Sequence, residues 1–235
     1  MSISLSNGVN YHAGEYLLIE DGRILGFERA SHLYSDLEVV DFSSDFCVPG
    51  LVDTAFLAPV GVNEDGTRPA GYGTGVWHAK QLSQKWLDSG VTSAASMGGI
   101  DRLDLDLGKS IAEGRLIGPR IYPALSPLVP AGMSNFGALY GVREVSGVDE
   151  ARRAVRELIK QGAERIVLYA DVPLEFHADP HETSRHRLVF SVDELVEMVT
   201  QARQAGCYLH AQAISAAAID NAFRLASVRL AVHSA

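Results

Sequence analysis

From Gly50 onward, the sequence repeats one pattern: a short apolar run, a few turn residues, and a segment with apolar residues at helical spacing. Strands that are buried on both faces of a parallel sheet read as continuous apolar runs, so the repetition predicts strands joined by helical crossovers. About six such units in series favour a TIM-type (β/α) barrel over an open sheet. The expected strands are residues 51–56, 91–95, 120–124, 165–170, 207–210 and 228–233, and the expected helices are residues 76–89, 107–113, 149–161, 192–205 and 215–225.

The first 49 residues contain only short strand patterns. Residues 15–20 and 23–27 are separated by Asp21-Gly22, a pair typical of a type I′ hairpin turn because glycine accepts positive φ. Residues 39–42 and 47–48 also read as strands. We therefore expect an α/β chain with two domains: a small β-sandwich-like unit at residues 1–49, and an incomplete (β/α) barrel at residues 50–235.

Charge and composition exclude several classes of protein. A net charge of -9, with scattered Lys and Arg, argues against a nucleic-acid partner. No signal peptide and no run of about 20 apolar residues is present, so we expect a cytoplasmic chain without a membrane span. Cys47 and Cys207 lie in apolar surroundings and are expected to be buried, free thiols. Small molecules and other proteins remain as partners.

One segment, residues 46–57, carries a recognisable motif, Val48-Pro49-Gly50-Leu51-Val52-Asp53-Thr54. It resembles the entry into the barrel of the amidohydrolase superfamily, specifically the branch of imidazolonepropionase and metal-dependent prolidases. That resemblance implies a barrel whose mouth holds one or two divalent metals, which activate water for attack on a C–N bond. Further motifs follow in the order of that branch: Gly90-Val91-Thr92-Ser93, Gly98-Gly99, Gly118-Pro119-Arg120, Gly162-Ala163 and His210-Ala211.

The metal ligands that the resemblance implies are mostly missing. Ala55 and Leu57 stand at the positions of the two histidines after the first strand, and Val167 stands at that of the carboxylated lysine. Only His210 and His233 match the histidines of the fifth and sixth strands, and the aspartate after the eighth strand has no counterpart. A catalytic zinc normally keeps three protein ligands, so we expect a largely lost metal site and no cofactor.

Several polar residues remain as candidates for chemistry. His210 and His233 are interpreted as an acid/base pair or as substrate anchors, because histidine titrates near neutral pH; the alternative is hydrogen bonding to loop backbone. Tyr169 and Asp171 sit at the carboxyl end of the fourth strand and are candidate catalytic residues. Asp171 is a candidate base if apolar neighbours raise its pKa, and otherwise it merely starts the loop. Gln212 is either a donor to a substrate carbonyl or a surface amide.

The loop of residues 171–187 is rich in histidines and acids and would hang over a barrel mouth. His177, Asp179 or His181 can be read as additional ligands that rescue a metal site with His210 and His233, or as parts of a solvated lid. The residues expected to line a substrate pocket are Phe56, Leu57, Val167, Gln212, Phe136 and His177.

Three functional hypotheses remain open. The first is a diverged, metal-independent enzyme that acts on a small organic or peptide-derived substrate by cyclisation, elimination, isomerisation or hydrolysis. The second is a non-catalytic binding or regulatory protein, whose open barrel edge is covered by a second copy or by a complementing chain. The third is a fragment of a C–N bond hydrolase. The first is favoured because ligand positions are replaced while turns and caps remain intact.

Overall fold

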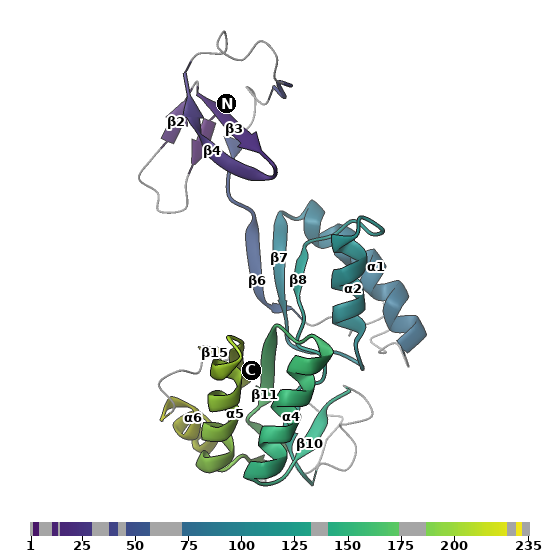
Figure 1. Cartoon of the computed structure of the whole chain (residues 1–235), viewed down its shortest axis with the longest axis vertical. Helices are drawn as coiled ribbons and strands as arrows, with labels where there is room; N and C mark the ends of the chain where they lie inside the picture. Colours follow the sequence, from purple (N-terminus) through teal and green to yellow (C-terminus); the bar gives the residue numbers. More distant parts are fainter. Residues whose placement is uncertain are drawn as a thin grey trace. The chain divides into compact units, whose positions relative to one another are not determined.

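A computed structural model describes residues 2–4, 11–13, 15–29, 38–41, 46–56, 72–132, 141–173, 187–224 and 229–231 (Figure 1). The chain divides into two compact units, Met1–Leu51 and Val52–Ala235. Helices occur in the second unit, together with parallel sheets, so the predicted mixed α/β class is confirmed. Cys47 and Cys207 are free thiols, but each is half-buried and not buried as predicted. Among the described residues, no helix combines the length and apolar character needed to span a membrane.

The first unit is built from short strands. β1 (Ser2–Ser4) pairs in antiparallel fashion with β2 (Tyr11–Ala13) and in parallel with β5 (Phe46–Cys47). β3 (Tyr16–Glu20) and β4 (Arg23–Glu28) form the predicted hairpin.

The turn between β3 and β4 has positive φ at both central residues, 51° at Asp21 and 73° at Gly22, as a type I′ turn requires.

The prediction of a strand at residues 39–42 is wrong over the described residues 38–41, which form no strand. Val39 and Val40 are 61% and 60% exposed there, so no sheet buries them.

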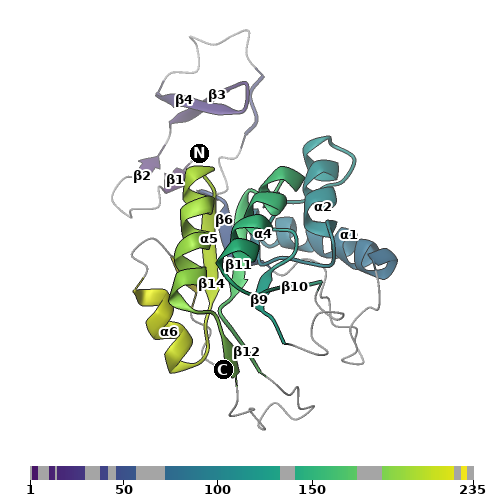
Figure 2. The same cartoon turned by 60° about the horizontal axis from the view of Figure 1, so that its bottom comes forward.

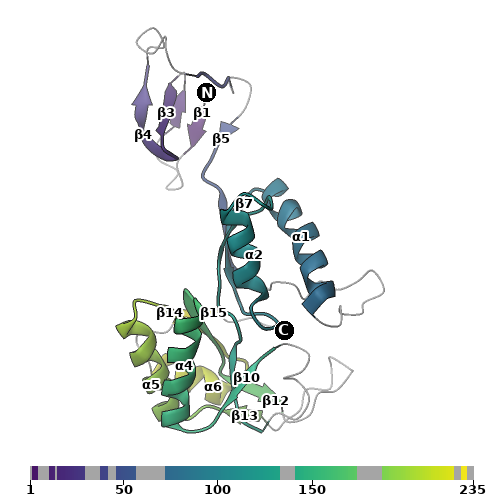
Figure 3. The same cartoon turned by 45° about the vertical axis from the view of Figure 1, so that its right-hand side comes forward.

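A three-stranded sheet opens the second part of the chain. Its order is β6 (Leu51–Phe56), β7 (Val91–Ser96) and β8 (Arg120–Tyr122). Two helices, α1 (Tyr72–Asp88) and α2 (Leu103–Ala112), lie next to each other and contact β7 and β8 respectively (Figure 3). The buried core between these elements consists of Phe56, Ala79, Ala94, Leu107 and Ile121.

A second sheet has the order β10-β9-β11-β14-β15 and is parallel throughout. Helices α4, α5 and α6 accompany it, with α5 beside α4 and α6 beside α5 (Figure 2). A short antiparallel pair, β12 (Asp171–Pro173) and β13 (Arg187–Val189), leaves the end of β11. The bounds are Leu128–Pro130 for β9, Arg143–Val145 for β10, Arg165–Tyr169 for β11, Tyr208–Gln212 for β14, Arg229–Ala231 for β15, Val148–Gln161 for α4, Val192–Gln204 for α5 and Ala216–Phe223 for α6.

The described strands after Gly50 do not form one closed barrel. They form the two parallel sheets and the β12–β13 pair. The prediction that β6 is buried on both faces is wrong, because Leu51 and Val52 are each 61% exposed and only Phe56 is fully buried. Leu51 and Val52 point to opposite faces of the sheet, so neither face is covered at the start of β6.

The spacing Ser191-x-x-Glu194 predicts a capping box at the start of α5, and the structure confirms it. The Ser191 hydroxyl accepts a hydrogen bond from the Glu194 amide, and the Glu194 carboxylate accepts one from the Ser191 amide.

We expect Ser191→Ala to lower the free energy of unfolding by about 1 kcal/mol, since two amide donors at the start of α5 depend on this pair. Urea unfolding measures the loss. Thr200→Ala in the same helix is the control and should be neutral within about 0.5 kcal/mol.

Candidate functional site

The two faces of β11 have different environments. Ile166 and Leu168 pack into the core that includes residues of α4 and α5, whereas Val167 and Tyr169 belong to a separate cluster on the opposite face. This alternation follows from the pleat of a strand, which directs successive side chains to opposite sides. We call the second cluster the inner cluster. It consists of Met97, Ala124, Val129, Val167 and Tyr169, with Ala55, Val142 and Leu188 packed against it.

Strand β14 adds polar groups beside the inner cluster. In the parallel ladder, His210 is the register partner of Val167, and Gln212 is the register partner of Tyr169. Leu209 and Ala211 pack toward the helices, so the alternation puts His210 and Gln212 on the face of the inner cluster. His210 is 7% exposed and Tyr169 is 8% exposed. The structure therefore brings together four of the predicted residues, from two neighbouring strands.

Asp171 lies just beyond the end of β11 and is held by several donors. Arg187 Nε donates to one carboxylate oxygen at 2.9 Å, and the amide of Ser215 donates to the same oxygen at 2.7 Å. The amide of Ile214 donates to the other oxygen at 3.2 Å. Asp171 thus connects the end of β11 to β13 and to the start of α6.

Burial by itself raises the pKa of Asp171, but the hydrogen bonds from Ser215 and Arg187, with the charge of Arg187, bring the pKa below its usual value. The base hypothesis required a raised pKa, and the environment of Asp171 gives the opposite direction. The carboxylate stays ionised near neutral pH and acts as an acceptor that fixes the surrounding backbone.

This arrangement of helices and parallel strands has known counterparts. No protein-family model and no curated protein sequence matches the chain. Among solved structures, phenylurea hydrolase B aligns with a TM-score of 0.75 and 19% identity over 97% of this chain and 58% of its own. The chain has the amidohydrolase fold.

Two further enzymes support that conclusion. A prolidase complexed with N-methylphosphonate-L-proline aligns with a TM-score of 0.70 and 23% identity, over 97% of this chain and 58% of the prolidase. Ochratoxinase from A. niger aligns with a TM-score of 0.68 and 19% identity, over 95% of this chain and 58% of the enzyme. The resemblance inferred from the sequence is confirmed at the level of the fold, and the chain spans little more than half of each of these proteins.

The metal centre that the amidohydrolase fold implies can be tested against the residues present. Ala55 and Val167, at two of the implied ligand positions, have no donor atoms and pack in the inner cluster. His210 is the one implied ligand within the described residues, where no group of three His, Cys, Asp or Glu side chains can hold a metal ion. Of the implied ligand positions among the described residues, two therefore hold side chains without donor atoms and one holds a histidine. The other implied or proposed ligands and lining residues, Leu57, Phe136, His177, Asp179, His181 and His233, lie outside the described residues.

Phe56 does not join the inner cluster, contrary to the sequence interpretation. Its ring packs edge-on against Trp86 of α1, with the ring centroids 4.2 Å apart. The reason is again the pleat: Ala55 faces the inner cluster, so its neighbour Phe56 faces the helices.

Three polar residues of this region were not identified from the sequence. Arg187 and Ser215 hold Asp171, although each reads locally as an ordinary loop residue or helix cap. Arg165 is a buried cation at the start of β11. A signal was available for Arg165, because a charged residue begins an otherwise apolar strand, next to Ile166 and Val167.

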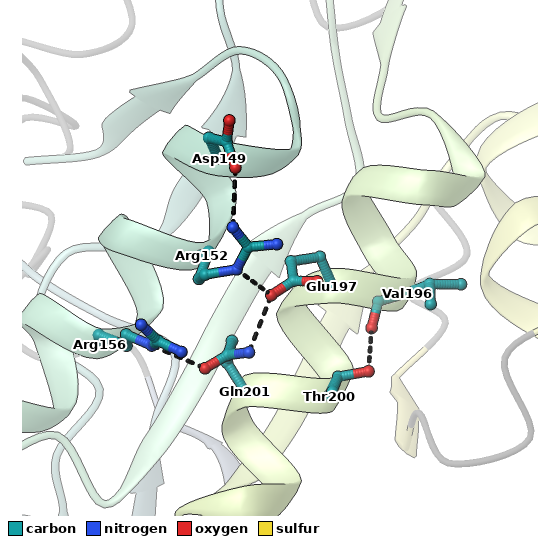
Figure 4. A network of polar contacts seen from close by, with 7 residues as sticks. All are labelled: Asp149, Arg152, Arg156, Val196, Glu197, Thr200 and Gln201. Carbon is teal, nitrogen blue, oxygen red and sulfur yellow. Dashed lines mark hydrogen bonds and ion pairs between the residues drawn. The ribbon is translucent and has the colours of Figure 1, made fainter.

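A separate polar network joins α4 to α5 (Figure 4). Arg152 donates to Glu197 at 2.7 Å, Gln201 donates to the same oxygen at 2.8 Å, and Arg156 donates to Gln201 at 2.8 Å. The hydrogen bond and charge of Arg152 lower the pKa of Glu197, and Glu197 raises the pKa of Arg152. The donors and acceptors satisfy one another, so we interpret this network as a structural connection between α4 and α5.

Proposed function

We propose that this chain is a diverged member of the amidohydrolase superfamily that binds a small organic or peptide-derived molecule and acts on it without a metal ion. The observation that supports this most directly is the pairing of His210 with Val167. An imidazole stands in register with a buried valine, at the level where the family resemblance places a metal ligand on each strand. In this proposal the strands belong to an incomplete (β/α) barrel.

The chemistry proposed for this face is proton transfer. His210 is the acid/base group, because an imidazole exchanges a proton near neutral pH. Gln212 is proposed to donate its amide N–H to a substrate carbonyl, and Tyr169 its hydroxyl. Val167 and Ala55 offer an apolar floor that excludes water. Proton transfer at such a site supports four types of reaction: cyclisation, elimination, isomerisation, and hydrolysis of a C–N bond.

Asp171 keeps a positioning role in the proposal. It fixes the backbone that follows Gln212, because it accepts the amides of Ile214 and Ser215. His233 and the lining residues Leu57, Phe136 and His177 remain sequence-based candidates for the same site.

The test is turnover by the purified chain with dipeptides that contain proline and with substituted phenylureas, in the presence and absence of a chelator. We expect chelator-independent turnover that falls at least about 100-fold in His210→Gln, the usual contribution of an acid/base group. His78→Gln, on α1, is the matched control and should retain full activity. Loss of activity with chelator, or stoichiometric metal that disappears in His210→Ala, would overturn the metal-independent reading.

A second candidate is a non-catalytic binding or regulatory protein that pairs with a second copy or a complementing chain. The observation that favours it is the exposure of large apolar side chains on β6, α1 and α6. On β6 and α1, Val52 is 61% and Trp77 65% exposed, and at α6 Phe223 is 66% exposed. Sedimentation and thermal unfolding test this candidate. A chain that sediments as a monomer and unfolds cooperatively would argue against it.

A further inference from the structure

Arg165 is a buried guanidinium at the first position of β11. It is 8% exposed, and burial lowers its pKa. An arginine nevertheless stays protonated in proteins, so a positive charge lies inside the second unit. Because Ile166 faces the helices, the pleat directs Arg165 to the same side as Val167.

The described residues satisfy this cation only in part. One terminal nitrogen donates to the carbonyl of Thr54 at 3.3 Å, while Nε, although fully buried, has no hydrogen-bond partner among the described residues. The carboxylate next to Thr54 in sequence is Asp53, and its Oδ1 accepts the amide of Ala55 at 2.9 Å. A buried charge without a counter-ion costs several kcal/mol, so an anion beside Arg165 would relieve a real penalty.

Tyr208, the register partner of Arg165 on β14, is 65% exposed, so the start of β14 lies at the surface next to the buried guanidinium. Arg165 lies on the same face of β11 as Val167, two residues nearer the amino end of the strand. The level of Val167 and His210 is therefore about 7 Å away along the strand.

We propose that Arg165 is the receptor for a carboxylate at the amino-terminal end of the parallel strands. The planar guanidinium fork matches a carboxylate with two parallel hydrogen bonds, and Nε together with a terminal nitrogen forms one such edge. The carboxylate can come from a small free molecule or from an Asp or Glu side chain of a second copy of the chain. The proposal does not depend on the proposed reaction.

The experiment compares the wild-type chain with Arg165→Met and with Arg120→Met. Arg120 is an exposed arginine on β8, which stacks on Tyr122 at 4.8 Å, and serves as the matched control. Formate replaces chloride at constant ionic strength while the melting temperature and the sedimentation coefficient are measured. If the site takes a free carboxylate, formate at about 100 times its dissociation constant should raise the melting temperature of the wild type and of Arg120→Met by about 5–10 °C, with no rise in Arg165→Met.

If the carboxylate belongs to a second copy, formate should leave the melting temperature of wild type and Arg120→Met unchanged or lower it. Both proteins should then sediment as an assembly that Arg165→Met does not form. The proposal is overturned if Arg165→Met is at least as stable as the wild type and the two proteins share the same response to formate and the same sedimentation.

Discussion

Replacing Asp171 with alanine is expected to lower the free energy of unfolding by about 3–5 kcal/mol, the usual cost of removing one member of a buried ion pair. The side chain of Asp171 is fully buried and that of Arg187 is 15% exposed, so the substitution leaves the guanidinium in a site that solvent barely reaches. It also removes the acceptor for the amides of Ile214 and Ser215 at the start of α6. Two neighbouring elements would lose their connection to β11 at once.

Urea unfolding of the purified chain measures this loss. Asp220→Ala is the matched control, because Asp220 is also paired with an arginine, Arg224, on the helix that Asp171 anchors. That pair is exposed, with 65% and 63% of its side chains accessible, so its removal should cost no more than about 0.5 kcal/mol. Equal effects of the two substitutions would contradict the anchoring role of Asp171.

The same carboxylate should make stability depend on acidic pH. Its pKa in the folded chain lies below the usual value near 3.8, so folding favours the ionised form. The stabilisation is complete above the pKa of the unfolded chain and is lost as the pH falls through the lower pKa of the folded chain. Asp171→Asn should therefore show a shallower loss of stability than the wild type below about pH 4.

The elements that the sequence predicted are those with local causes. The hairpin at Asp21-Gly22, the helix before Gly162 and the capping box at Ser191 each depend on residues within a few positions of one another. Gly162 has φ of 110° and ends α4 in the left-handed conformation that glycine accepts. Such signals are visible without the rest of the fold.

The candidate site was predictable only as far as strand register allows. Placing Val167 and His210 on neighbouring strands needed only the order of the strand patterns, and the ladder pairs them directly. The partners of Asp171 were not predictable in this way, because Arg187 and Ser215 are 16 and 44 positions away. The direction of its pKa depends on those distant donors, so the condition set for a base at Asp171, a pKa raised by apolar neighbours, is not met.

Gly98→Ala is the second substitution with a large expected effect, about 2–4 kcal/mol of lost stability. Gly98 follows β7 and has φ of 96°, a conformation that an L-residue adopts only with strain. A Cβ there would overlap the ring of Pro127 and lie 2.9 Å from the carbonyl oxygen of Leu125. Overpacking of this kind typically costs 1–3 kcal/mol in addition to the backbone strain.

The surrounding loop has little freedom to move away. The carboxylate of Asp104 accepts the amides of Ala124 and Leu125 at 2.7 and 3.0 Å, and Gly99 donates to the carbonyl of Leu125 at 3.0 Å. Gly206→Ala is the control, because Gly206 also has positive φ, 71°, but no atom lies within 4 Å of a Cβ built there, and its cost should be about 1 kcal/mol. Thermal unfolding of both variants decides the point: a melting temperature of Gly98→Ala no lower than that of Gly206→Ala would show that the loop yields. Met97, the residue before Gly98, belongs to the inner cluster. The loop around Gly98 is therefore directly joined to the proposed site.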